Sequence, residues 1–153
     1  MLKFFTKIIS TFFYVGYFPL IPGTAGSLAA VFLFFLIKNN SATYLITLTA
    51  LLILGFLVSG AAEKIMRKTD PSCVVIDEVC GMLISLFFLP YDIRLVIIAF
   101  FIFRILDTLK PYPISSFEKL KGGLGIMSDD VIAGLYTNLI LQVVVSFTSL
   151  SAA

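Results

Sequence analysis

The sequence predicts an all-α integral membrane protein, a bundle of about four to five membrane helices that forms a single domain over residues 1–153. Apolar residues make up 59% of the chain and charged residues 13%, whereas soluble domains average about 45–50% and about 25%. The mean hydropathy is +1.07. Long apolar stretches recur along the chain between short polar breaks. A soluble core of this size cannot bury so much apolar surface, which excludes an ordinary soluble domain and a disordered chain.

The first apolar stretch, residues 4–21, begins with Lys3 and Lys7 and is interrupted by glycine and proline. These interruptions predict an interfacial segment instead of a membrane span. Residues 27–37 form the next apolar stretch, which is shorter than the roughly 20 residues that a full span needs. We expect a short helix there that enters the membrane.

The longer apolar stretches that follow complete the predicted bundle. They are residues 44–62, 74–89, 95–109 and 131–147. Proline marks the end of two of them, because Pro90 follows the second stretch and Pro111 lies just beyond the third.

The charges in the polar breaks predict the orientation of the bundle. Of the 11 Lys and Arg residues, only Lys38 and Arg94 fall in the turns on one side, and Asp92 is the only acidic residue there. Positive residues concentrate on the cytoplasmic side of membrane proteins. We therefore predict a multi-pass membrane protein with its polar site facing the cytoplasm.

The composition also excludes several kinds of chemistry. The chain has no histidine, which removes the commonest general base and most catalytic zinc sites. A net charge of +2 without a basic stripe argues against a nucleic-acid partner. Cys73 and Cys80 are about two helical turns apart, which predicts two buried thiols on one helix face, too far apart for a disulfide.

Asp77 and Glu78 lie near one end of an apolar stretch, where two adjacent carboxylates need a partner. An ionised Asp at the centre of a membrane helix costs about 2.5–3.5 kcal/mol. A divalent cation or a basic side chain would offset that cost. Gly81 follows Asp77 by one turn on the same helix face, which lets a ligand or another helix approach closely.

Arg104, Asp107 and Lys110 recur at every third position and share one broad helical face. This pattern has two interpretations. The residues form an internal ladder of ion pairs, or Asp107 binds a metal ion while Arg104 and Lys110 hold a phosphate group. The spacing alone favours neither.

A glycine-rich stretch, residues 122–125, precedes Ser128, Asp129 and Asp130. The backbone amides of such a stretch can surround an anion. Ser128 suits the N-cap of the following helix, and the two acids suit its first turn. The alternative is that the acids only balance the helix dipole.

Five carboxylates are expected at one membrane face, and they are the candidate catalytic and metal-binding residues: Asp77, Glu78, Asp107, Asp129 and Asp130. Carboxylates that converge in this way repel one another without cations, and hard oxygen ligands suit Mg²⁺. The candidate phosphate-binding residues are Thr24, Ser27, Arg104 and Lys110. Thr24 and Ser27 open the short helix, where each hydroxyl equally suits a helix cap. Together these groups favour metal-assisted hydrolysis of a phosphate monoester on a lipid headgroup.

These motifs together resemble the phosphatidylglycerophosphatase A family. The matching pieces are Pro22-Gly23-Thr24 with Gly26-Ser27, Asp77-Glu78 with Cys80-Gly81, Phe103-Arg104 with Asp107 and Lys110-Pro111, and Gly123 through Gly134. The resemblance implies a Mg²⁺-dependent, helical inner-membrane phosphatase that converts phosphatidylglycerophosphate and water to phosphatidylglycerol and phosphate. It also implies that the five acids form the site, with Arg104 and Lys110 beside them.

Two other functions stay open from the residues alone. A small multi-span transporter or ion-conducting protein would use the acids as an ion path, and a structural membrane subunit would only pair its charges internally. Clustering of the acids at one membrane face, away from the midplane, favours the phosphatase. The oligomeric state is not predicted.

Overall fold

The computed structural model describes residues 2–117 and 119–147, and every regular element in these ranges is helical. This confirms the all-α prediction. The elements are α1 (Leu2–Ser10), the 3₁₀ turn η1 (Val15–Tyr17), α2 (Pro22–Ile37), α3 (Ser41–Met66), α4 (Ile76–Ser85), α5 (Ile93–Leu109), α6 (Ile114–Phe117) and α7 (Gly123–Phe147).

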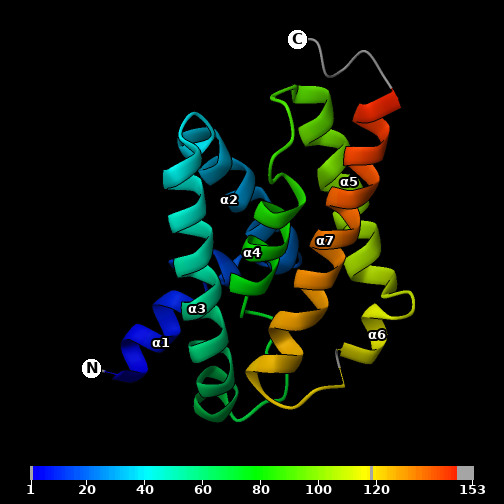
Figure 1. Ribbon diagram of the computed structural model, residues 1–153. Helices are drawn as coiled ribbons and strands as arrows, with labels where there is room; N and C mark the ends of the chain where they lie inside the picture. Colours follow the sequence, from blue (N-terminus) through cyan, green and yellow to red (C-terminus); the bar gives the residue numbers. More distant parts are fainter. Residues whose placement is uncertain (1, 118, 148–153) are drawn as a thin grey trace.

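The short helix α4 lies in the middle of the bundle, with α3 on one side and α5 and α7 on the other (Figure 1). Nine of its 10 residues are buried. A helix of this length rises about 15 Å, half of a hydrocarbon core of about 30 Å. The helix that begins with Asp77 and Glu78 therefore does not cross a membrane by itself and is enclosed by its neighbours.

Within the described residues, two helices are long and apolar enough to cross a membrane, α3 with 26 residues and α7 with 25. Only 22% and 33% of their most apolar windows are buried inside the protein. Their outer faces carry apolar side chains such as Ile46, Leu57 and Leu139, which are 70%, 69% and 60% exposed. Outward apolar faces of this kind suit contact with lipid. The shorter apolar helix α2 has 16 residues, and the number of spans remains a prediction.

Two helices begin earlier than the sequence pattern predicts. Helix α2 begins at Pro22 and α7 begins at Gly123, whereas we expected starts at residues 27 and 131. Proline suits the first position of a helix, because no intrahelical partner is needed for its missing N–H. In α7 the glycine serves close packing, since a Cβ at Gly123 would lie 2.7 Å from the Phe56 carbonyl oxygen of α3.

The predicted helix 74–89 is shorter in the structure, because α4 ends at Ser85. The chain then turns, with Phe88 in the left-handed region at φ 53°. Asn138 of α7 donates hydrogen bonds to the carbonyls of Ser85 (3.2 Å) and Phe87 (2.7 Å). A side chain distant in sequence thus satisfies carbonyls that the end of a helix leaves without partners.

The N-terminal segment, residues 2–21, begins with α1, which lies beside α3 and extends to one side of the bundle (Figure 1). Its exposed side chains are largely aromatic or aliphatic, including Phe4, Phe5, Phe13, Phe18 and Leu20. This segment contains α1 and η1 but no helix long enough to span a membrane. The exposed apolar side chains suit the predicted interfacial location, which stays a prediction.

Helices α4 and α7 approach closely through two glycines. A Cβ at Gly134 would overlap the Gly81 carbonyl oxygen, and a Cβ at Gly81 would lie 2.6 Å from the Asp130 carbonyl oxygen. Gly81 therefore serves helix packing, one of its two predicted uses. This contact places Asp130 beside the first turn of α4, where Asp77 and Glu78 lie.

Candidate active site

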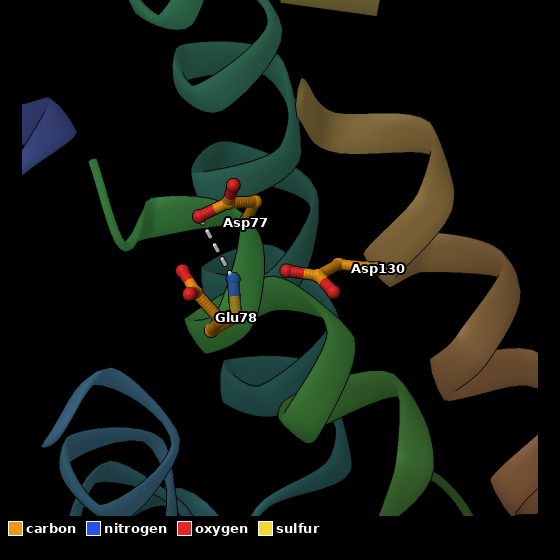
Figure 2. A group of neighbouring side chains, drawn as sticks. All are labelled: Asp77, Glu78 and Asp130. Carbon is orange, nitrogen blue, oxygen red and sulfur yellow. Dashed lines mark hydrogen bonds between the residues drawn. The ribbon is translucent and has the colours of Figure 1, made fainter. Parts of the chain in front are cut away.

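Three carboxylates from two helices meet near one end of the bundle. Asp77 and Glu78 come from the first turn of α4, and Asp130 reaches toward them from α7 (Figure 2). One carboxylate oxygen from each residue lies within 4.8 Å of the other two. Asp77 and Asp130 are only 6% and 3% exposed. We call these three residues the acidic trio.

The acidic trio has unused hydrogen-bonding capacity. Oε2 of Glu78 and Oδ1 of Asp130 are buried and have no hydrogen-bond partner among the described residues. Asp77 uses one oxygen, Oδ1, to accept a hydrogen bond of 3.0 Å from the Glu78 backbone N–H. Buried carboxylate oxygens without partners are costly. A hard divalent cation fits these residues, because it would accept the unused oxygens as ligands and balance their charge.

The other two predicted acids are ion-paired. Asp107 accepts a hydrogen bond of 2.6 Å from Nη1 of Arg104, one helical turn away on α5. Asp129 accepts a hydrogen bond of 2.7 Å from Nζ of Lys110, which lies directly after α5. The Arg104–Asp107 pair is one step of the predicted ion-pair ladder, whereas the binding of a metal ion or phosphate by this pattern stays a prediction. The ladder exists in part, and its members face the acidic trio across one cavity.

That cavity has a volume of about 230 Å³, and all seven acidic and basic candidates for the site line it: Asp77, Glu78, Arg104, Asp107, Lys110, Asp129 and Asp130. We call it the acidic cavity. The predicted convergence of the five acids is therefore present in the structure. The distribution of roles among them stays a prediction.

Asp70 and Ser72 also line the acidic cavity, and the sequence analysis did not select them. They lie in the loop between α3 and α4, where Asp70 has a left-handed backbone at φ 44° and its N–H donates to Oε1 of Glu63 (3.0 Å). The available signal was a short polar run between two apolar stretches. Such runs are usually solvated loops, so the pattern did not by itself indicate that Asp70 and Ser72 line a site.

The predicted capping roles of Thr24 and Ser27 are wrong. Because α2 begins at Pro22, both residues lie inside the helix, and the N-cap position belongs to Ile21. The buried Ser27 hydroxyl donates to the Gly23 carbonyl oxygen at 3.0 Å, an intrahelical bond. Neither hydroxyl lines the acidic cavity, and their role in phosphate binding remains untested.

Gly23 is the residue of this motif that meets the site. A Cβ there would overlap Oε1 of Glu78 and lie 3.2 Å from Nη2 of Arg104. The absence of a side chain therefore lets the first turn of α2 form one wall of the acidic cavity.

The predicted N-cap role of Ser128 is also wrong, because α7 begins five residues earlier, at Gly123. The glycine-rich stretch does not form an anion-binding loop. The backbone N–H groups of Gly125 and Ile126 both donate to the Gly122 carbonyl, at 3.0 and 3.3 Å, within the first turn. Asp129 and Asp130 accordingly lie in the second turn, where the helix dipole explains them less well.

The two cysteines differ from the prediction in one respect. Cys80 is fully buried in α4, as expected. Cys73 precedes that helix, is only partly buried, and lies with its Sγ 3.4 Å from Sδ of Met66. The expected shared helix face is therefore wrong, because α4 begins at Ile76.

The phosphatidylglycerophosphatase A family matches residues 8–145, nearly the whole chain. The chain belongs to this family. All seven charged candidates of the acidic cavity lie inside the matched range. Membership places the chain among phosphatases and confirms the family resemblance of its motifs.

Relatives in three bacteria are similar over most of their length. Phosphatidylglycerophosphatase A of Escherichia coli (strain K12) is 39% identical over 123 residues, covering 78% of this chain and 72% of the relative. The protein of the same name from Haemophilus influenzae is 36% identical over 124 residues, covering 78% and 76%. A putative phosphatidylinositol-3-phosphatase of Bacteroides thetaiotaomicron is 40% identical over 152 residues, covering 92% and 94%. No solved structure matches the chain.

Proposed function

We propose that this protein is a Mg²⁺-dependent lipid phosphatase that hydrolyses phosphatidylglycerophosphate to phosphatidylglycerol and inorganic phosphate. The observation that carries the proposal is the acidic cavity, where the acidic trio with its unpartnered oxygens faces Arg104 and Lys110. Family membership supports the reaction, since two relatives carry the name phosphatidylglycerophosphatase A.

In this proposal the acidic trio holds the metal ion. Three carboxylates supply hard oxygen ligands and leave further coordination positions, as Mg²⁺ prefers. A bound ion of this kind polarises a phosphoryl oxygen and neutralises developing negative charge. The trio provides the anchor because its members lie on helices that pack closely, α4 and α7, and because Asp77 and Asp130 are buried.

Arg104 and Lys110 bind the phosphate oxygens. The guanidinium presents parallel N–H donors and the ammonium a compact charge, and both stabilise the phosphoryl group during transfer. Asp107 and Asp129 orient the two cations through the ion pairs of 2.6 and 2.7 Å. In this division all five acids have a role. Three bind the metal ion, and two orient the cations that bind phosphate.

The reaction is direct attack by water. The water oxygen bonds to phosphorus, the bond between phosphorus and the glycerol oxygen breaks, and the leaving oxygen takes up a proton. A carboxylate of the cavity accepts the proton that the water loses, which replaces the absent histidine as general base.

We place the enzyme in the inner membrane with the acidic cavity on the cytoplasmic side. The distribution of Lys and Arg between the two ends of the bundle supports this orientation. The apolar outer faces of α3 and α7 support lateral access of a lipid substrate.

The decisive assay is release of inorganic phosphate from phosphatidylglycerophosphate in mixed micelles, with Mg²⁺ and with excess chelator. We expect release only with Mg²⁺. Equal release in chelator would contradict the metal requirement, and no release in either condition would contradict the reaction.

A second substrate follows from one relative. The Bacteroides protein is named a putative phosphatidylinositol-3-phosphatase and covers 92% of this chain. Its substrate is also a phosphate monoester on a lipid headgroup, so the same cavity chemistry applies. Parallel assays with phosphatidylinositol 3-phosphate separate the two, and we expect the larger kcat/KM for phosphatidylglycerophosphate.

A transporter is less well supported by the arrangement. The acidic cavity lies at one end of the bundle, where α4 begins, and an ion path needs polar groups across the whole thickness. Ion flux into vesicles without phosphate release would favour the transporter instead.

A further inference from the structure

The chain segment that leads into α4 is held on one side by the N-terminal segment. The Val75 backbone N–H donates a hydrogen bond of 2.9 Å to the carbonyl of Ser10, the last residue of α1. Gly16 of η1 lies against Cys73, where a Cβ would overlap the carbonyl oxygen and lie 2.8 Å from the carbonyl carbon. Only a residue without a side chain fits at this position.

The same segment also packs against α2. A Cβ at Gly26 would lie 2.9 Å from Cβ of Val75 and 3.2 Å from its carbonyl oxygen. Val75 itself is completely buried, and Val74 is 3% exposed. Residues 73–75 therefore contact two glycines from different elements, and there is no room for a side chain at either glycine.

This packing matters because the start of α4 has no side-chain cap. Val75 occupies the N-cap position, and its side chain cannot accept a capping hydrogen bond. Asp77 and Glu78 follow within the first turn. Any displacement of residues 73–75 is thus passed directly to two members of the acidic trio.

We propose that Ser10, Gly16 and Gly26 form a clasp that positions Asp77 and Glu78 for metal binding. This proposal rests on the proposed function. The three residues lie outside the acidic cavity, so they act through residues 73–75 and are positioning residues. The clasp also gives the N-terminal segment a role in catalysis, although that segment contributes no chemical group to the cavity.

The test is the full-length Gly16→Ala variant in detergent micelles. We measure the Mg²⁺ concentration that gives half of the maximal thermal stabilisation, and separately kcat and KM for phosphatidylglycerophosphate. Loss of groups that position metal ligands typically weakens metal affinity or activity about 10–100-fold, and we expect a rise of this size in the Mg²⁺ requirement. KM should change little, because the phosphate-binding cations Arg104 and Lys110 lie on and directly after α5 and are not part of residues 73–75.

The matched control is Leu48→Ala, which removes a buried side chain from α3 and leaves residues 73–75 intact. It lowers the melting temperature but should leave the Mg²⁺ requirement unchanged. If both variants shift the Mg²⁺ requirement equally, the effect of Gly16→Ala is ordinary destabilisation and the clasp is rejected.

A second variant covers the case in which Gly16→Ala does not fold. Val75→Ala loosens the clasp instead of crowding it, and we expect a smaller rise in the Mg²⁺ requirement, with kcat reduced. A wild-type Mg²⁺ requirement in Val75→Ala overturns the clasp while leaving the proposed function intact. If Mg²⁺ neither stabilises the wild-type protein nor supports phosphate release, both proposals fail together.

Discussion

The Asp130→Asn variant removes one charge from the acidic trio and keeps the volume of the side chain. Two unit charges no more than 4.8 Å apart repel by about 3.5 kcal/mol or more at an effective dielectric constant of about 20. Asp130 faces two such partners, so the fully ionised trio without a cation would carry about twice that repulsion from this residue. Proton uptake by the wild-type trio relieves most of this repulsion. We therefore expect the substitution to raise the free energy of unfolding without Mg²⁺ by only about 1–2 kcal/mol.

The assay compares thermal unfolding with and without Mg²⁺. Without the ion, Asp130→Asn should melt above the wild-type protein, since about 1 kcal/mol moves the midpoint of a domain of this size by about 2–4 °C. With Mg²⁺ at about 100 times its Kd, the wild-type protein gains about 2.7 kcal/mol, and the variant should lose most of this gain. Phosphate release should fall by about 100-fold or more, because a metal ligand is lost.

Asp92→Asn is the matched control, because Asp92 is an N-cap residue that pairs with Arg94 away from the acidic cavity. It should keep wild-type phosphate release and Mg²⁺ stabilisation. An Asp130→Asn variant with full activity and an unchanged Mg²⁺ response would refute the assignment of the acidic trio as the metal site.

Three further predictions test other parts of the site and the fold. Asp129→Asn should leave the protein folded but strongly reduce phosphate release, because it breaks the 2.7 Å pair with Lys110; a normal rate in the micelle assay contradicts its role. Arg104→Lys should raise KM about tenfold with a smaller change in kcat, since a forked donor is replaced by a point charge; steady-state kinetics check this, and an unchanged KM removes Arg104 from phosphate binding. Gly134→Ala should lower stability by about 1–3 kcal/mol or more, because its Cβ overlaps the Gly81 carbonyl; a melting temperature equal to that of the wild-type protein speaks against the close α4–α7 contact.

The sequence predicted the helices best where the pattern is local. Apolar stretches located α3 and α5 to within a few residues, because each stretch reports directly on the length of one helix. The starts of α2 and α7 were missed, since glycine and proline there indicate breaks on local grounds. In the structure those residues begin helices. Glycine is favoured at position 123 because the close contact with the Phe56 carbonyl of α3 leaves no room for a side chain.

The candidate residues were predicted better than their roles. Asp77 and Glu78 were selected because acids in an apolar stretch are costly, Asp107 because of its helical spacing with Arg104 and Lys110, and Asp129 and Asp130 because they follow a glycine-rich stretch. The sequence did not separate the acidic trio from Asp107 and Asp129, because that division depends on which carboxylates Arg104 and Lys110 reach. It also missed Asp70, a loop residue whose place in the acidic cavity depends on how residues 67–75 fold back.

By itself, the sequence determined the class of protein and its chemical inventory: an apolar helical chain with no histidine and with acids gathered at the breaks. These properties follow from composition and local periodicity. Only the tertiary structure decided that Asp130 meets Asp77 and Glu78, because the meeting depends on α4 and α7 touching at Gly81 and Gly134. Contact between helices distant in the chain is set by the shapes of both surfaces, and the pattern of either helix alone does not contain it.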